Sequence, residues 1–176
     1  MFGRPYCLFA GERQTATQKR IKDTPHFAAS AMKVQEPVMR PTEDYAAMKK
    51  LAVESGLEEG TLIHIVSSYG YYDGSELVGC AALRQENDVY SLECLAVRER
   101  YRYQGLGSRL VNTIEKDAKA RGAVRLWALA RAPNFFKKMG YMEAGKGGQG
   151  GPNLTSCENC PQYRRNCNPE ILLKNL

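Results

Sequence analysis

An apolar strand, a glycine-containing turn and an amphipathic helix follow one another in the middle of the chain, and this succession limits the folds open to it. The strand is expected over residues 89–97, and the turn has the sequence Arg102-x-x-Gly105-x-Gly107. A helix N-terminus carries unpaired N–H groups and the positive end of the helix dipole. Glycines leave those N–H groups open to phosphate oxygens, so the turn predicts a cradle for a pyrophosphate.

Two other phosphate-binding folds fit the surrounding sequence poorly. No Gly-Lys-Ser/Thr follows the glycines, which excludes a mononucleotide P-loop. Before the motif the chain has the pattern of antiparallel hairpins, which disfavours the strand–helix–strand unit of a Rossmann dinucleotide site. The two glycines alone are weak evidence, because glycines also mark plain turns.

Hydrophobic periodicity and turn residues predict the elements on both sides of the motif. The expected strands cover residues 38–40, 69–72, 76–83, 89–97, 124–129 and 141–144. A first helix is expected from a cap at Thr42 to Gly56, and a short helix over residues 133–138. Residues 57–68 fit either a short helix or a loop. The helix after the glycine turn has one apolar stripe that we expect to be buried: Leu106, Leu110, Val111, Ile114 and Ala118.

The positive charge of the chain is concentrated in one region. The 176 residues include 25 Lys and Arg against 19 Asp and Glu, a formal net charge of +6. Nine basic and three acidic side chains lie between residues 98 and 131. A local positive field favours one anionic ligand over a nucleic-acid-binding surface, although a solvated basic helix face gives the same pattern. No apolar run approaches the roughly 20 residues of a membrane span.

Three parts are expected along the chain. Residues 1–31 are interpreted as a disordered basic extension, residues 32–146 as the folded domain, and residues 147–176 as a glycine linker and a cysteine-containing tail. Met32 is an alternative start, and a transit peptide is a third interpretation, which Glu12 and Asp23 weaken. The first residues lack the apolar core of a secretory signal, so a cytoplasmic location is expected.

Residues 38–144 resemble a GCN5-related N-acetyltransferase (GNAT) in the order of their elements and in two motifs. Arg102, Gly105 and Gly107 match the family's Gln/Arg-x-x-Gly-x-Gly/Ala signature, and residues 93–97 match the strand before it. Residues 132–141 resemble a later motif, a short helix followed by Gly and an aromatic residue. The resemblance implies the acyl-CoA N-acyltransferase fold, an α/β (α+β) structure. In this fold a mixed, mostly antiparallel twisted sheet is flanked by helices, and the cofactor lies where two neighbouring strands splay.

The resemblance also implies acetyl-coenzyme A (acetyl-CoA) as co-substrate and a primary amine as acceptor. The pantetheine is expected to pair with the backbone of Leu95 and Val97, and the pyrophosphate to sit on the N–H groups of residues 103–108. The cofactor-binding residues implied in this way are Leu95, Ala96, Val97, Arg102, Tyr103, Gln104, Gly105, Leu106, Gly107, Ser108 and Asn134.

Direct transfer in this family needs a neutral amine, so a base must take a proton from the substrate ammonium. Glu93 stands where many members keep that base and is the expected catalytic residue. Its alternative role is that of a strand carboxylate which faces solvent or pairs with an arginine. Many members also place a Tyr in the later short helix to protonate the leaving thiolate, but Phe135-Phe136 stand there. Tyr141 is expected to be a packing residue.

Three of the six cysteines, Cys157, Cys160 and Cys167, cluster near the C-terminus. The Cys-x-x-Cys spacing lets two thiolates reach one metal ion, and a third cysteine adds one more ligand. No fourth ligand is evident, so no metal ligand is assigned. Packed reduced thiols, a metal site, an iron–sulfur cluster and a redox pair all stay open.

The cysteine tail resembles that of short N-acetylglutamate-synthase-like acetyltransferases. A dicarboxylate acceptor such as glutamate would need cationic partners, for which the candidates are Arg40, Arg84, Arg125 and Arg131. The resulting hypothesis is acetyl transfer to an amino acid. Alternatives are acetylation of a protein or of a xenobiotic amine, and a non-catalytic acyl-CoA or metal sensor. The expected partner is a small-molecule amine, with no nucleic acid and no membrane, and a homodimer is left open.

Overall fold

The computed structural model describes residues 36–57, 62–144, 151 and 155–176. Within this part of the chain a seven-stranded sheet has the order β1-β2-β3-β4-β5-β7-β6. The strands are β1 (Val38–Pro41), β2 (Ile65–Asp73), β3 (Glu76–Glu86), β4 (Val89–Val97), β5 (Arg125–Ala130), β6 (Met142–Glu143) and β7 (Glu170–Asn175). Neighbouring strands pair antiparallel except β4 and β5, which are parallel. The expected mixed, mostly antiparallel sheet is therefore confirmed.

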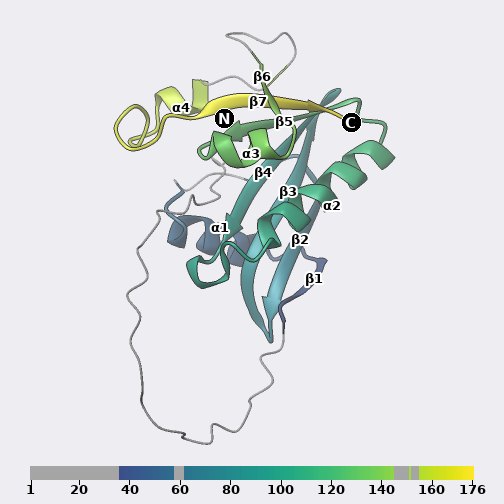
Figure 1. The fold of residues 1–176 in the computed structure, drawn as a ribbon, viewed down its shortest axis with the longest axis vertical. Coiled ribbons are helices and arrows are strands. Elements are labelled where there is room, and N and C mark those ends of the chain that lie inside the picture. Colours follow the sequence, from purple (N-terminus) through teal and green to yellow (C-terminus); the bar gives the residue numbers. More distant parts are fainter. Residues whose placement is uncertain (1–35, 58–61, 145–150, 152–154) are drawn as a thin grey trace, which may run out of the picture.

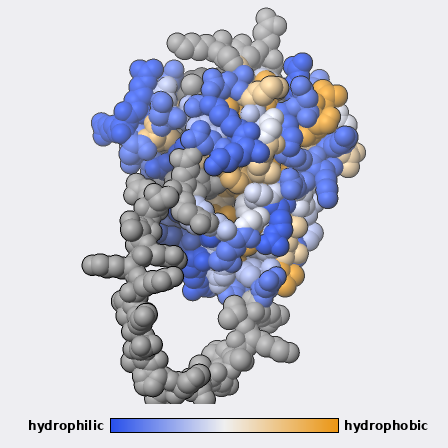
Figure 2. Space-filling view, viewed as in Figure 1, coloured by the Kyte–Doolittle hydropathy of each residue, from blue (hydrophilic) through white to orange (hydrophobic). Residues whose placement is uncertain are grey.

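Helices cover both faces of this sheet (Figure 1). α1 (Tyr45–Glu54) packs on one face against β3 and β4, and α2 (Leu106–Ala120) and α3 (Pro133–Lys138) pack on the other. A 3₁₀ turn, η1 (Glu99–Tyr101), precedes α2, and a short helix, α4 (Thr155–Glu158), precedes β7. Hydrophilic residues cover most of the surface seen in Figure 2. Among the helices of the described ranges, none has the length and apolar character that a membrane crossing requires.

α2 forms as its apolar stripe predicts. All five stripe residues are buried: Leu106, Leu110, Val111, Ile114 and Ala118. They join one core with side chains of the sheet and with Phe136 of α3. Gly105 (φ 79) precedes the helix and Gly122 (φ 88) follows it. Both take the left-handed conformation, which glycine adopts without the steric cost of a Cβ atom.

The N-terminal end of α1 differs from the predicted one. The cap is Asp44, whose carboxylate accepts a hydrogen bond from the Ala47 N–H at 2.9 Å. The prediction of Thr42 as the cap is wrong, because Thr42 lies too far before the first residue of α1. Its hydroxyl instead accepts from the Asp44 N–H at 3.2 Å and contacts the Tyr72 hydroxyl at 2.7 Å. Residues 57–68 were expected to form either a short helix or a loop. They include the start of a strand, since β2 begins at Ile65.

The last strand, β7, lies inside the sheet, between β5 and β6 (Figure 1). Its register places Leu173 opposite Trp127 and Ile171 opposite Leu129. This pairing was not predicted, and the residues of β7 were interpreted only as part of the cysteine-containing tail. The division of the chain into three parts stays a prediction. Residues 1–31 and the glycine linker, apart from Gly151, lie outside the described residues.

The sheet opens between β4 and β5. Among the described residues, the parallel pairing of these strands ends with Leu92 opposite Ala128. On the other edge of β4, the register with β3 shifts by one residue near Cys94, which has a φ of 53°. This shift is a β-bulge, and a bulge bends its strand and increases the local twist. Residues 93–97 of β4 therefore run on beyond the last pair with β5.

Candidate active site

A cavity of about 270 Å³ lies at the N-terminus of α2, beside the end of β4. Its walls come from β4, from the turn that follows it, from the first residues of α2 and from α3. The lining residues are Val97, Tyr101, Arg102, Tyr103, Gly105, Leu106, Gly107, Ser108 and Phe135. The structure thus brings the glycine turn and the end of the strand to one cavity.

The turn leaves the first N–H groups of α2 for an external partner. It reaches the helix through Tyr103 (φ 62) and Gly105 (φ 79), which are both in the left-handed conformation. Gly105 is the N-cap and has no side chain to accept from the first N–H groups. The first turn of α2 holds no acidic residue. These N–H groups and the positive end of the helix dipole are suited to an anion.

Gly107 leaves space that the fold itself does not need. A Cβ atom on Gly107 would lie 3.6 Å from Cζ of Phe135 and 3.8 Å from Cγ2 of Val97, which are ordinary contacts. Its backbone is not among those with a positive φ. Neither packing nor strain therefore requires glycine here, and the missing side chain leaves room in the cavity. A bulky anionic group such as a pyrophosphate fits this arrangement.

Two arginines place positive charge at the turn and also brace it. Arg102 donates from Nε to the Val97 carbonyl at 2.9 Å, which joins the turn to the end of β4. Burial lowers the pKa of the Arg102 guanidinium, which still stays charged at neutral pH. Arg109 donates from Nη2 to the Gln104 carbonyl at 3.0 Å, which joins the turn to α2.

The end of β4 presents backbone groups on the side where β5 has separated. The Arg98 N–H donates to the Val78 carbonyl of β3 at 2.8 Å. Successive residues of a strand point their N–H and C=O groups to opposite edges, so those of Val97 point away from β3. Leu95, two residues earlier, points the same way. The Val97 carbonyl is already engaged by Arg102, so an extended ligand would meet an edge that is partly occupied.

Glu93 lies beside the bulge, on the α1 face of the sheet. Its register partner Ala82 belongs to the core under α1. The residue is buried, at 4% exposure, so the alternative in which its side chain faces solvent is wrong. The Ser91 hydroxyl donates to Glu93 Oε1 at 3.2 Å. Arg84 stands 3.9 Å from the same oxygen while its Nη2 binds Glu86 at 2.5 Å, so the arginine is shared between two carboxylates.

The two cysteines next to Glu93 suit packing rather than covalent catalysis. Cys80 and Cys94 are fully buried, and their Sγ atoms lie 4.0 Å apart. The hydrogen bond with Cys80, together with burial, raises the pKa of the Cys94 thiol well above its usual value. The thiol therefore stays protonated at neutral pH, whereas the thiolate is the nucleophile.

The residues predicted to bind a cofactor fall into two groups. One group lines the cavity: Val97, Arg102, Tyr103, Gly105, Leu106, Gly107 and Ser108. The other group is buried in β4 or exposed at the surface: Leu95, Ala96, Gln104 and Asn134. Tyr101 and Phe135 also line the cavity but were not predicted. Tyr101 stands directly before the predicted Arg102, and Phe135 directly after the predicted Asn134. Aromatic residues beside the two motifs were the signal that could have found them.

The four candidate arginines for an acidic acceptor lie in different places. Arg84 is beside Glu93, and Arg131 follows the end of β5. Arg40 stacks on the Tyr72 ring at 3.9 Å, at the β1 edge of the sheet. Arg125 is exposed at the start of β5. The structure therefore places one of the four, Arg84, against the predicted base.

Arg131 fastens the C-terminal segment to the end of α1. Its Nη1 donates to the Gly56 carbonyl and, at 2.9 Å, to Gln162 Oε1. Its Nη2 lies 3.4 Å from the Asn166 carbonyl, and Gln162 Nε2 also donates to the Gly56 carbonyl at 3.3 Å. Three segments that are distant in sequence thus meet at one side chain.

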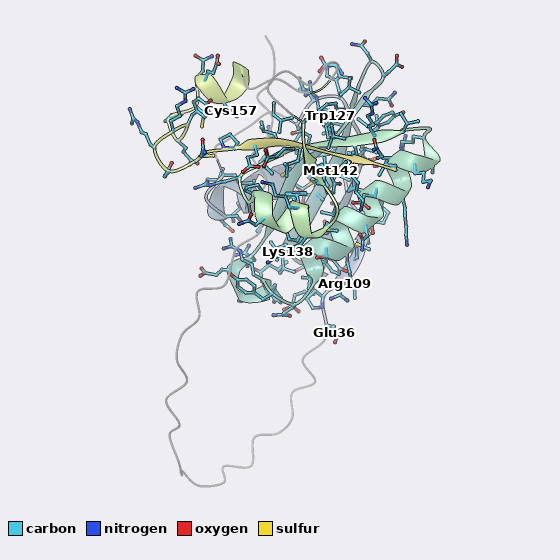
Figure 3. All side chains as sticks on the ribbon, turned by 45° about the horizontal axis from the view of Figure 1, so that its top comes forward. Glu36, Arg109, Trp127, Lys138, Met142 and Cys157 are labelled. Carbon is cyan, nitrogen blue, oxygen red and sulfur yellow. The ribbon has the colours of Figure 1, made fainter. Side chains whose placement is uncertain are left out.

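The cysteine segment packs against the domain. Cys157 and Cys167 are 4% and 5% exposed, and the Cys160 N–H donates to the Cys157 carbonyl at 2.8 Å. Figure 3 shows Cys157 on α4 at the opposite side of the molecule from Arg109 on α2. Within the described ranges, no group of three or more His, Cys, Asp or Glu side chains is arranged to hold a metal ion. The interpretations of this cysteine cluster stay predictions.

The sequence model of the Acetyltransferase (GNAT) family matches residues 28–141, which is more than half of the chain. The chain belongs to this family. An uncharacterized N-acetyltransferase of Chlorobaculum tepidum is 30% identical over 143 residues, which cover 79% of this chain and 88% of the relative. The resemblance expected from the two motifs is confirmed.

Two further proteins are similar over part of their length. An amino-acid acetyltransferase of Pseudomonas fluorescens is 38% identical over 68 residues, which cover 37% of this chain and 16% of the relative. The N-acetylglutamate synthase of Neisseria gonorrhoeae, solved with coenzyme A and N-acetyl-glutamate, has a TM-score of 0.62 at 24% identity. That match covers 82% of this chain and 36% of the synthase, and it supports the GNAT fold. The chain therefore spans well under half the length of both proteins.

Proposed function

We propose that this GNAT-family chain transfers the acetyl group of acetyl-CoA to the primary amine of a small amino acid such as glutamate. The observation that carries the proposal is the cavity at the N-terminus of α2, which lies beside the strand end that β5 leaves unpaired. A helix N-terminus without a cap side chain and a strand edge are what a nucleotide pyrophosphate and an extended pantetheine chain require.

On the donor side, the pyrophosphate binds the N–H groups at the start of α2, in the space that Gly107 leaves. Arg102 and Arg109 supply positive charge next to it. The pantetheine runs along β4 and bonds to the backbone of Leu95 and Val97. Because Arg102 already engages the Val97 carbonyl, the Leu95 groups and the Val97 N–H carry this pairing. Bound acetyl-CoA supplies the thioester carbonyl that an amine attacks.

On the acceptor side, Glu93 takes the proton from the substrate ammonium, directly or through water. Its burial keeps the carboxylate out of bulk solvent, and the Ser91 hydroxyl holds its orientation at 3.2 Å. Positioned acid–base catalysis of this kind contributes about 10²–10⁴-fold to a rate. The Phe135-Phe136 pair offers no proton to the leaving thiolate, which has a pKa of ~8.5 and needs little assistance.

The acceptor class rests on two supports. Two of the similar proteins are amino-acid acetyltransferases, and one structural neighbour was solved with N-acetyl-glutamate. Arg84 beside Glu93 offers a cation for a carboxylate next to the reacting amine. An amino acid carries both groups on one carbon, so the charge pattern of this site suits it.

The test is a turnover assay of the full chain with acetyl-CoA and a panel of free amino acids, polyamines, lysine peptides and aromatic amines. Release of free thiol and the mass of the product are both measured. Acetylation of glutamate or another amino acid in preference to the rest is the expected result. Preference for a peptide or a polyamine would overturn the acceptor class, and absence of turnover with every amine would overturn the catalytic assignment.

A further inference from the structure

The turn between β2 and β3 carries two carboxylates that face each other. Asp73 ends β2 and Glu76 begins β3, and the register of the hairpin pairs them directly. Like charges in directly opposed positions destabilise a strand pair. Some other part of the molecule must therefore offset this repulsion, and the contacts of both side chains show which part it is.

Both carboxylates bind the segment that leads into the glycine turn. The Tyr101 hydroxyl donates to Asp73 Oδ2, and this hydrogen bond raises the pKa of the tyrosine. Arg100 Nη2 lies 2.5 Å from Glu76 Oε2, and Arg98 Nε lies 3.3 Å from Glu76 Oε1. The hairpin turn is thus held to η1 and its flanking residue by three side chains.

The two sets of contacts differ in strength. Arg100 and Glu76 are 58% and 43% exposed, and ion pairs at such exposure contribute little. The contact between Tyr101 and Asp73 is partly buried and joins a neutral donor to a charged acceptor, a stronger class of hydrogen bond. Tyr101 also lines the cavity at the start of α2, so this contact ends at the wall of the site.

The segment that the hairpin holds has a backbone that is costly to maintain. Tyr103 adopts a φ of 62°, and a non-glycine residue in this conformation persists where its surroundings hold it. Gln104 Nε2 donates to the Arg100 carbonyl at 3.0 Å, so the residues on the two sides of Tyr103 are already connected. An anchor on Tyr101 and Arg100 therefore limits the positions that the glycine turn can take.

We propose that Asp73 and Glu76 are positioning residues for acetyl-CoA, which act through Tyr101 and Arg100 to hold the glycine turn in its binding conformation. The inference rests on the proposed function, because it assumes that the cavity receives the nucleotide part of the donor. Asp73 has the larger role and Glu76 the smaller one. Neither side chain belongs to the lining of the cavity, so both act on the ligand through the turn.

The experiment measures coenzyme A binding by calorimetry for the full chain with Asp73→Asn, Tyr101→Phe and the double substitution. One lost hydrogen bond to a charged group corresponds to roughly 10- to 150-fold, and because this contact acts on the ligand only through the turn, each single variant is expected to weaken binding about 5- to 20-fold. The double variant is expected to bind coenzyme A as tightly as the single variant with the lower affinity, because both substitutions remove the same contact. Glu76→Gln is expected to weaken binding about twofold to threefold.

Steady-state kinetics separate positioning from chemistry. The KM for acetyl-CoA is expected to rise with the dissociation constant, while kcat at saturating acetyl-CoA stays within about twofold of the wild type. The control is Asp88→Asn, which changes an exposed aspartate in the turn between β3 and β4 and is expected to leave the dissociation constant and the KM unchanged. Tyr101→Phe keeps the ring and the packing, so it tests the contact even where Asp73→Asn fails to fold.

Binding by Asp73→Asn and Tyr101→Phe within twofold of the wild type would overturn the proposal, as would additive effects in the double variant. A fall in kcat without a change in KM would overturn it as well. If the wild type itself does not bind coenzyme A, the proposed function fails. If the wild type and all the variants bind it equally well, only the positioning role of Asp73 and Glu76 fails.

Discussion

The cavity at the N-terminus of α2 comes almost wholly from one continuous stretch, residues 97–108, to which α3 adds Phe135. The surroundings of Glu93 come instead from separate strands, because Arg84 of β3 stands beside it and Ser91 of β4 donates to it. A local stretch leaves a signature in the sequence, whereas a site assembled from distant segments does not. The donor side can therefore be inferred from a motif, while the acceptor side needs the structure.

The largest expected effect is on the donor side and comes from Gly107→Glu. A carboxylate at this position would fill the cavity and repel the phosphates, so coenzyme A affinity is expected to fall at least about 100-fold. The fold is expected to survive, because a Cβ atom there meets ordinary contacts only. Calorimetry measures the affinity and circular dichroism the fold.

Gly107→Ala is the matched control for this variant. The added methyl group meets its neighbours at ordinary contact distances and carries no charge, so the melting temperature is expected to stay within a few degrees of the wild type. Coenzyme A affinity close to the wild type in Gly107→Glu would contradict the cavity as the donor site.

On the acceptor side, Glu93→Gln is expected to lower kcat about 10²–10⁴-fold, because the amide keeps the shape but cannot take a proton at neutral pH. Coenzyme A affinity is expected to stay within about twofold. Part of the lost rate is expected to return at high pH, where more of the substrate amine is already neutral. The pH profile of kcat for both proteins checks this expectation.

Glu43→Gln, an exposed carboxylate before α1, serves as the control with unchanged kcat. A rate within threefold of the wild type at pH 7 would remove Glu93 from the catalytic residues. Loss of coenzyme A binding together with the rate would point to a structural role instead.

A smaller effect is expected from Arg131→Met, which removes the fastening of the C-terminal segment. Its hydrogen bonds reach both Gly56 and Gln162, so a loss of roughly 1–3 kcal/mol in the free energy of unfolding is expected. Leu57, next to Gly56, belongs to the core that includes Cys94 and Ala82 beside Glu93. A looser end of α1 is therefore expected to raise the KM for the amine several-fold while coenzyme A affinity stays unchanged. Thermal unfolding and kinetics measure the two effects.

Arg125→Met, at an exposed arginine on the start of β5, is the comparison variant and is expected to change neither quantity. Equal behaviour of the two variants would mean that Arg131 does not shape the acceptor side.

The smallest effect is expected from deletion of residues 1–31, which have no core-forming pattern in the sequence. Melting temperature is expected to change by about 1 °C or less, and kcat and both KM values to stay the same. A fall of more than about 5 °C would show that this segment packs on the domain.

Local patterns predicted the parts of the fold that depend on neighbouring residues. The buried stripe of α2 follows from a period of 3.6 residues, and Gly105 and Gly122 mark its two ends through their left-handed conformation. The cap of α1 was misplaced at Thr42, although Asp44, two positions later, is the stronger type of capping residue.

Long-range pairing set the parts that were not predicted. β7 joins the sheet by placing Ile171 opposite Leu129, and no short-range pattern specifies a partner about forty residues away. The contact between Tyr101 and Asp73 has the same character, since it connects a turn to a separate hairpin. Burial of Glu93 could not be predicted either, because it depends on how β3 and α1 cover that part of β4.

The most direct test of the account compares two ligands of the wild-type chain, coenzyme A and pantetheine. Pantetheine has the chain that would pair with β4 but lacks the pyrophosphate that would bind the start of α2. If the glycine turn supplies most of the affinity, calorimetry is expected to show pantetheine binding at least about 100-fold more weakly than coenzyme A. Equal affinity for the two ligands would contradict the assignment of the cavity to the pyrophosphate.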